Sequence, residues 1–242
     1  MGARSIIGML VGAIGLLAWF STLERFRAFM PVLLHGAETT LRITAIASVL
    51  AFAFAIIAAL ARLYGLLPIR WLARVYIEMF RGTSLLVQLF WLYFVLPEFG
   101  MSLAPFTVAV LALSLNTGAY GAEVVRAAIE AVPSGQWEAS TAVNMTRTQA
   151  LRRIILPQAL ILMIPPWGNL FIELLKATAL VSLITIPDLT FRALELNSIT
   201  LKTIDIFTLV LLIYLTISLM LTIIMRGLEG AASRGLARGR VH

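Results

Sequence analysis

Apolar residues in this chain fall in long runs, not in the strict alternation typical of a half-buried strand. The longer runs reach the length of about 20 residues that an α-helix needs to cross the hydrocarbon core of a bilayer. The runs cover residues 5–20, 41–61, 84–96, 103–122, 160–186 and 206–225. This pattern predicts an all-α membrane protein with about five core transmembrane helices and an additional N-terminal helix.

The first run is about 16 residues long, at the lower limit for a span. It fits a helix that either crosses the membrane or lies at its interface. A signal peptide is the alternative, but no small-x-small cleavage site follows the run, which favours a retained helix. We expect three regions: an N-terminal apolar helix and outer segment (1–30), a transmembrane domain (31–226) and a basic cytoplasmic tail (227–242).

One long polar segment, residues 134–157, interrupts the apolar pattern. Ser134 is a good N-cap for a short helix, and Thr146 followed by Gln149 matches the capping box that starts a second helix. Asn144, between them, tolerates a left-handed turn. The segment therefore predicts two short helices joined at a bend.

The second of these helices is expected to end at Leu156, because the residue before a proline disfavours the helical region. Exposed Trp137, Val143 and Met145 would suit insertion of an apolar face into a partner's groove. The alternative is an ordinary amphipathic cytoplasmic loop.

Composition agrees with a membrane location. Of the 242 residues, 60% are hydrophobic and 13% charged, and the mean hydropathy is +0.95. No Gly-x-x-x-x-Gly-Lys-Ser/Thr phosphate loop is present, so any ATP hydrolysis belongs to a partner. Cysteine is absent, and neither His35 nor His242 has neighbours that suggest a metal site or a catalytic dyad. We expect no catalytic residue, metal or cofactor.

The net charge of +7 is a weak sign of nucleic-acid binding in a membrane protein, where the placement of Lys and Arg matters more than their sum. Arginines gather after run 41–61, around segment 134–157 and after run 206–225. The positive-inside rule places these regions, with the C-terminus, in the cytoplasm. Residues 66–78 would form an amphipathic elbow at the interface. Members of the three groups are Arg62, Arg70, Arg74 and Arg81; Arg126, Arg147, Arg152 and Arg153; and Arg226, Arg234, Arg238 and Arg240.

The polar segment resembles a known loop. Glu138-Ala139-Ser140, Asn144 and the Ile-Leu-Pro that ends at Pro157 are similar to the Glu-Ala-Ala, Gly, Ile-x-Leu-Pro loop of ABC importer permeases. Ser140 replaces the second alanine and Asn144 replaces glycine, both mild changes. Flanking motifs, at 80–83, 118–123, 132–136 and 174–176, resemble the polar amino acid uptake permeases.

The resemblance covers residues 31–226 and implies a type I ABC importer permease fold in the bacterial inner membrane. It implies an ATPase-coupling loop made by Trp137, Glu138, Ala139, Ser140, Asn144, Met145, Leu156 and Pro157. The implied partners are a pair of ATPase subunits, a second permease subunit (identical or a sister), an extracytoplasmic solute-binding protein and membrane lipid. The permease itself is not the enzyme.

Residues 80–97 look most like permeases for ectoine and hydroxyectoine, which are zwitterionic compatible solutes. Polar amino acids are the alternative. A more remote alternative is an ion-coupled secondary transporter, in which Glu173, Lys176 and Glu123 would form a relay.

Candidate pathway residues follow from the cost of ionisable groups inside a bilayer. Glu173 and Lys176 are three residues apart on one helix face, with Asn169 one turn earlier and the pair Pro165-Pro166, expected to kink the helix, before it. They either neutralise each other in packing or meet the charges of a zwitterion. Another wall would come from Asn116, Tyr120 and Glu123, which share a face of the preceding span, where Gly118 and Gly121 allow close helix contact.

Overall fold

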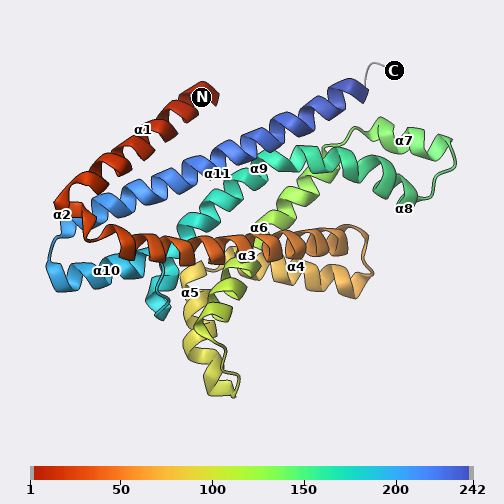
Figure 1. Ribbon diagram of the computed structural model, residues 1–242. Coiled ribbons are helices and arrows are strands. Elements are labelled where there is room, and N and C mark those ends of the chain that lie inside the picture. Colours follow the sequence, from red (N-terminus) through yellow and green to blue (C-terminus); the bar gives the residue numbers. More distant parts are fainter. Residues whose placement is uncertain (1–2, 240–242) are drawn as a thin grey trace.

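The computed structural model describes residues 3–239, and every regular element in this range is helical (Figure 1). The first half contains α1 (Ala3–Thr22), α2 (Glu24–Arg27), α3 (Met30–Tyr64), α4 (Leu67–Gly82), α5 (Leu85–Phe90), a π-helical turn (Trp91–Val95), a 3-10 turn (Leu96–Phe99) and α6 (Pro105–Glu130). The second half contains α7 (Ser134–Ala142), α8 (Arg147–Ala150), a π-helical turn (Leu151–Ile155), α9 (Leu156–Ala177), a 3-10 turn (Thr178–Ile184), α10 (Leu189–Thr200) and α11 (Thr203–Gly239).

Within residues 3–239, five helical segments are long and apolar enough to cross a membrane: Ser5–Thr22, Met30–Tyr64, Pro105–Glu130, Arg147–Ile184 and Thr203–Ala232. A sixth crossing is formed if Leu67–Gly82 and Leu85–Phe99, which meet at a bend of 106°, count as one broken span. The predicted number of core helices and the additional N-terminal helix are thus confirmed.

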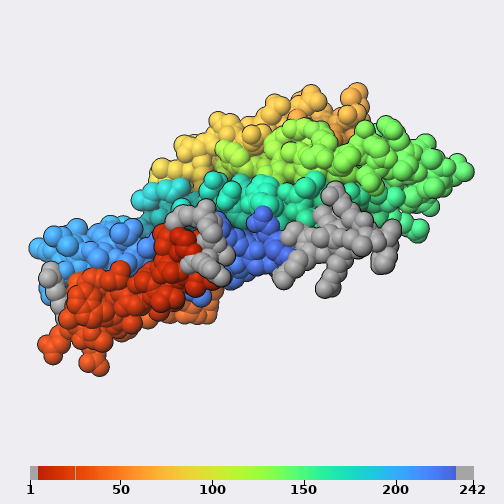
Figure 2. Space-filling model, turned by 90° about the horizontal axis from the view of Figure 1, so that it is seen from above, coloured from red at the N-terminus to blue at the C-terminus, as the bar shows by residue number. Residues whose placement is uncertain are grey.

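The N-terminal helix α1 packs against α11 (Figures 1 and 2). Ile6 and Ala13 are buried in this contact, whereas Val11 and Trp19 point away and are largely exposed. Figure 2 shows α1 at one edge of the molecule, with α4 and α7 toward the opposite edge. An apolar outer face of this kind suits contact with lipid.

Small residues bring α3, α6 and α9 close together. Ala47, Ala51 and Ala55 of α3 are fully buried, and α6 contributes Gly118 and Gly121 to the same contact. A Cβ atom on Gly121 would lie 2.5 Å from the ring of Trp167 in α9. Without a hydrophobic driving force in lipid, such close backbone approach supplies the packing energy between helices.

Proline interrupts the helices less than the sequence predicted. The helix does not end at Leu156: α8 runs through a π-helical turn into α9, and the Leu156 N–H donates to the carbonyl of Leu151. A π turn is wider than an α turn, which makes room for the ring of Pro157. Pro165 and Pro166 lie inside α9, which continues through both of them.

Helix α11 extends beyond the predicted span 206–225 and continues to Gly239. Most of the predicted basic tail is therefore helical. Its last residues, 240–242, and residues 1–2 at the N-terminus lie outside the described part of the chain.

Candidate coupling loop and solute pathway

The polar segment forms two short helices joined at a bend, as predicted. The first, α7, begins at Ser134, so Pro133 and not Ser134 occupies the N-cap position, with φ −54° and ψ 137°. Ser134 is already the first helical residue, and its side chain makes no cap. The extended backbone that an N-cap needs is one that proline adopts readily.

The bend uses the left-handed conformation expected of Asn144, whose φ is 56°. The Asn144 N–H donates to Thr141 O at 3.0 Å, and the Met145 N–H donates to Ser140 O at 3.0 Å. These are the two hydrogen bonds of a Schellman motif, which satisfies the last carbonyls of α7. The predicted turn at Asn144 is confirmed.

The second helix starts with the predicted capping box. The Gln149 N–H donates to Thr146 Oγ1 at 3.3 Å, and the Thr146 N–H donates to Gln149 Oε1 at 2.9 Å. Both ends of the bend are thus held by local hydrogen bonds, which gives the second helix a defined direction.

The surface of α7 divides into an inward and an outward face. Trp137 is half-buried against the core that α3, α6 and α9 share. Met145 is also half-buried, so the expectation that these two side chains are exposed was wrong. Glu138 and Ala139 face outward, and Val143 is 69% exposed. Ser140 is buried, with Oγ donating to Gln136 O at 2.6 Å, so its hydroxyl is satisfied within the helix.

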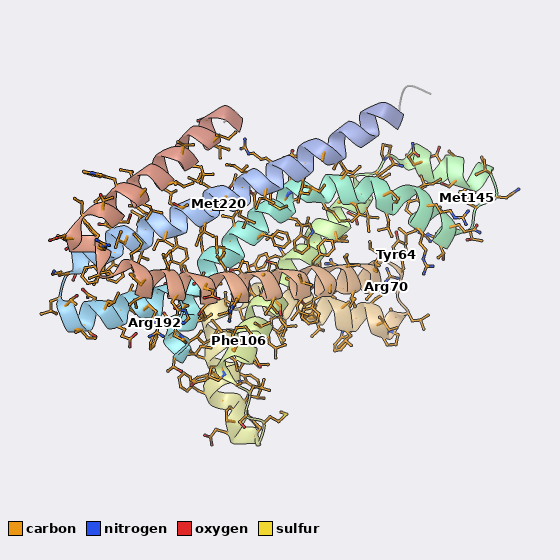
Figure 3. All side chains as sticks on the ribbon, in the orientation of Figure 1. Tyr64, Arg70, Phe106, Met145, Arg192 and Met220 are labelled. Atoms are coloured by element: carbon orange, nitrogen blue, oxygen red, sulfur yellow. The ribbon has the colours of Figure 1, made fainter. Side chains whose placement is uncertain are left out.

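A groove of about 420 Å³ lies between α7 and α8, lined by Trp137, Thr141, Met145, Arg147 and Ala150. Figure 3 places Met145 at the tip of this loop, away from the body of the protein. Leu156 and Pro157, the other predicted loop residues, do not line this groove and lie at the start of α9. A groove with an aromatic floor and an adjacent acidic residue suits docking of a protein partner.

Two of the predicted pathway residues stabilise the sharp corner between α4 and α5. Asn116 Nδ2 donates to Phe80 O at 2.9 Å and to Gln88 Oε1 at 3.1 Å. The Tyr120 hydroxyl donates to Arg81 O at 3.3 Å. A bend of 106° frees backbone carbonyls, and carbonyls at membrane depth need a protein partner. Asn116 and Tyr120 supply it from α6.

Glu123 lies at the centre of an ionic cluster that joins three helices. Its carboxylate pairs with Arg62 of α3, with Arg126 Nε at 2.8 Å and with Arg81 Nη1 of α4 at 3.7 Å. Arg126 also pairs with Glu130 at 2.6 Å. The Glu123 side chain is only 20% exposed, so these contacts are partly shielded from water. We call this group, Arg62, Arg81, Glu123, Arg126 and Glu130, the Glu123 cluster.

The other predicted wall lies on α9. Asn169, Glu173 and Lys176 are all exposed on the surface of the single subunit. Within this subunit no ion pair within 4.0 Å joins Glu173 to Lys176, although both are described. Asn169 also borders a cavity of about 230 Å³ between α9 and α11. Glu173 and Lys176, for which pairing was one of the two predictions, therefore present their charges outward.

The structure does not link the two predicted walls directly. The hydrogen bonds and ion pairs of Asn116, Tyr120 and Glu123 go to α3, α4, α5 and α6, and none reaches α9 within the described range. Sequence reasoning missed the partners Arg62, Arg81 and Gln88. The arginines had been noted only as markers of the cytoplasmic side, and no local pattern pairs residues that are about 40 to 60 positions apart. No group of three or more His, Cys, Asp or Glu residues that could hold a metal occurs among the described residues.

Comparisons with known proteins agree with this geometry. Residues 51–234 match the family model of the binding-protein-dependent transport system inner membrane component. The chain belongs to this family. Its members are non-catalytic, multi-pass inner-membrane permease subunits of ABC transporters, and a partner ATPase hydrolyses ATP.

Individual relatives have similar lengths. The L-cystine transport system permease of Bacillus subtilis is 40% identical over 213 residues, which are 88% of this chain and 91% of that protein. The glutamine transport system permease of Escherichia coli is 36% identical over 202 residues, which are 83% of this chain and 92% of that protein. A probable amino-acid ABC transporter permease of Sinorhizobium fredii is 53% identical over 165 residues, which are 66% of this chain and 69% of that protein.

Solved structures show the same fold. A crystal structure of an amino acid ABC transporter with histidines superposes with a TM-score of 0.81 and 36% identity, covering 87% of this chain and 99% of that chain. An inward-facing methionine ABC transporter superposes with a TM-score of 0.71 at 20% identity, covering 85% and 98%. The predicted type I ABC importer permease fold is confirmed.

Proposed function

We propose that this chain forms the solute pathway of an ATP-driven importer and docks to its ATPase through residues 134–157. The observation that carries the proposal is the coupling loop: a Schellman turn at Asn144 and a capping box at Thr146 hold α7 beside a groove, with Glu138 exposed. The arginines around the loop and after α11 support a cytoplasmic location for the loop and the C-terminus.

The proposed solute is a polar amino acid. The relatives reported above are named for L-cystine and glutamine, and the solved amino acid transporter is described as a structure with histidines. The likeness of residues 80–97 to ectoine and hydroxyectoine permeases supports those solutes as the second candidate. Amino acids and ectoines are both zwitterions, so Glu173 and Lys176, exposed with opposite charges on one face of α9, could meet either.

The proposed assembly contains two permeases, two ATPases and an extracytoplasmic solute-binding protein. Glu173 and Lys176 support a second permease subunit, because unpaired charges at membrane depth cost roughly 2.5–3.5 kcal/mol each unless they face protein or water. Movement of the ATPases would shift the coupling loops and open the pathway alternately to each side.

A charge reversal tests the docking role. Glu138→Lys should leave membrane insertion intact but reduce co-purification of the ATPase, or uncouple ATP hydrolysis from uptake. Glu78→Lys is the matched control, because Glu78 is also exposed but lies on α4 outside the loop. Normal uptake and normal ATPase co-purification by Glu138→Lys would rule out the docking role.

The solute is tested on the binding protein that works with this permease. Calorimetry with glutamine, cystine, histidine and ectoine should show tight binding of an amino acid and weak binding of ectoine. The reverse order would favour the second candidate.

A further inference from the structure

A second cavity lies beside residues 134–157. Its lining differs from that of the groove between α7 and α8, which we call the docking groove. It has a volume of about 570 Å³ and lies between the corner that joins α3 to α4 and the helical segment 147–156. Volumes of this size hold small organic ligands. In Figure 3, Tyr64 and Arg70 mark the α3–α4 side of this place, just below α8.

Three arginines line this cavity: Arg70 from α4, Arg147 from α8 and Arg152 from the π-helical turn that follows α8. Across the part of the chain that the structure describes, no carboxylate lies within 4.0 Å of their guanidinium groups. Arg70 Nε donates to Arg62 O at 3.2 Å, which holds this guanidinium at the end of α3 and leaves its terminal nitrogens available. The arrangement contrasts with the Glu123 cluster, where the arginines share two carboxylates.

The rest of the cavity wall is largely apolar and continuous with the membrane-spanning helices. Leu60 and Leu63 come from the last turns of α3, Leu151 from the π-helical turn and Leu156 from the start of α9. Next to the cavity, the α4 elbow exposes Leu66, Leu67 and Trp71, at 74%, 80% and 65%. Exposed apolar residues and tryptophan at the end of a span are typical of the membrane interface.

We propose that this cavity binds the phosphate headgroup of an anionic phospholipid. Arg70, Arg147 and Arg152 would hold the phosphate by charge-assisted hydrogen bonds. The acyl chains would lie along Leu60, Leu63 and Leu156. Basic pockets between transmembrane segments on the cytoplasmic side are suited to anionic lipid headgroups. The cytoplasmic placement rests on the function proposed above.

A lipid fits better than the ATPase because the helix α7, which presents Glu138, contributes no residue to this cavity. Residues of α7 line the docking groove instead. Arg147 alone lines both sites. The lipid headgroup would thus contact a side chain that also borders the groove between α7 and α8.

Lipid retention by the assembled transporter tests the site. The purified permease–ATPase complex is mixed with detergent micelles that contain equal amounts of phosphatidylglycerol and phosphatidylcholine, purified again, and its bound lipid is measured by mass spectrometry. The wild type should retain phosphatidylglycerol in excess. Arg70→Gln with Arg152→Gln should lower the phosphatidylglycerol to phosphatidylcholine ratio at least fivefold. Arg147 is left unchanged because it also borders the docking groove.

The control is Arg74→Gln with Arg153→Gln, which removes the same charge from α4 and the same π-helical turn outside the cavity. It should retain lipid like the wild type. Equal ratios in all three proteins would overturn the proposal, as would equal loss in the control. Displacement of the lipid by inorganic phosphate would indicate a soluble anion site. Selective retention of phosphatidylglycerol by the permease alone but not by the permease–ATPase complex would assign the cavity to the protein interface. The ATPase should co-purify with every variant, so failure of the lipid site would leave the docking role standing.

Discussion

Asn144 shows how one residue determines the shape of the proposed coupling loop, residues 134–157. Its left-handed backbone allows the two Schellman hydrogen bonds that end α7 and redirects the chain into the capping box at Thr146. Glycine reaches this conformation at no steric cost, asparagine at a small one and β-branched residues at a large one. The turn therefore depends on backbone conformation more than on side-chain contact.

Substitutions at Asn144 should separate these effects. Asn144→Gly is expected to be neutral or slightly stabilising, whereas Asn144→Val should cost on the order of 1 kcal/mol or more in loop strain. Thermal unfolding of the purified permease, together with ATPase co-purification, would measure both. Equal tolerance of glycine and valine would contradict the assigned turn.

Asp188 is a buried carboxylate outside the membrane-spanning segments. Its Oδ1 accepts from the Phe191 N–H at 2.8 Å as the N-cap of α10, while Oδ2 is buried with no hydrogen-bond partner within the described chain. Burial raises the pKa of this carboxyl to about 6, despite backbone hydrogen bonds that lower it. The charged form is thus costly in the folded protein.

This raised pKa predicts a pH dependence. The folded protein holds the proton between pH 4 and 6 while the unfolded chain releases it, so the stability contributed by this group is present below about pH 4 and is lost as pH rises to 6. Asp188→Asn keeps the N-cap acceptor but does not ionise. Relative to the wild type, the stability of this variant should rise by about 2 kcal/mol between pH 4.5 and pH 7.5. Melting temperatures at both values measure this, and an unchanged difference between the proteins would count against a raised pKa.

The helices α3, α6 and α9 pack closely because small residues lie between them. The buried alanines of α3 and Gly121 of α6 leave space that the Trp167 ring of α9 fills. Trp167 also forms an edge contact with Phe52 at 5.0 Å between ring centroids. A side chain at position 121 would have to move this ring or separate the helices.

Gly121→Ala should therefore destabilise the permease by about 1–3 kcal/mol, because it overpacks a rigid contact. Gly227→Ala in α11 is the matched control, since nothing lies within 4 Å of a Cβ atom there. It should be neutral or slightly stabilising, as alanine favours a helix. Thermal unfolding in detergent distinguishes the two, and equal melting temperatures would show that the contact is more adaptable than its geometry indicates.

At the level of the whole molecule, the exposed charges of Glu173 and Lys176 limit what can contact this surface of the subunit. They lie on the outer surface of α9 without an ion pair between them. Lipid is an unfavourable neighbour for such groups, so we expect this face to contact protein or water, as in the proposed assembly.

A double substitution tests this placement. Glu173→Gln with Lys176→Met should still assemble and hydrolyse ATP when the loaded binding protein docks, yet transport little solute. Hydrolysis and uptake are measured on the same liposome sample. Uptake at the wild-type level would exclude a pathway role and leave packing between subunits as the explanation.

The spans could be predicted from the sequence, as could the turn and the capping box of the proposed coupling loop. The N-cap of α7 and the continuation of the helix through Leu156 could not. Apolar runs predict spans because no water satisfies the backbone inside a bilayer. The turn at Asn144 and the capping box could be predicted because their hydrogen bonds join residues within five positions of each other.

Which distant residues meet depends on the tertiary structure. It assigned Asn116 and Tyr120 to the α4–α5 corner, Glu123 to three arginines, and Trp137 to the core. It also brought Arg70 to Arg147 and Arg152, about 80 positions apart in the chain, around one cavity. Helix propensity and hydrophobic pattern are local, whereas such contacts depend on how the helices cross, which is set by the small residues between them.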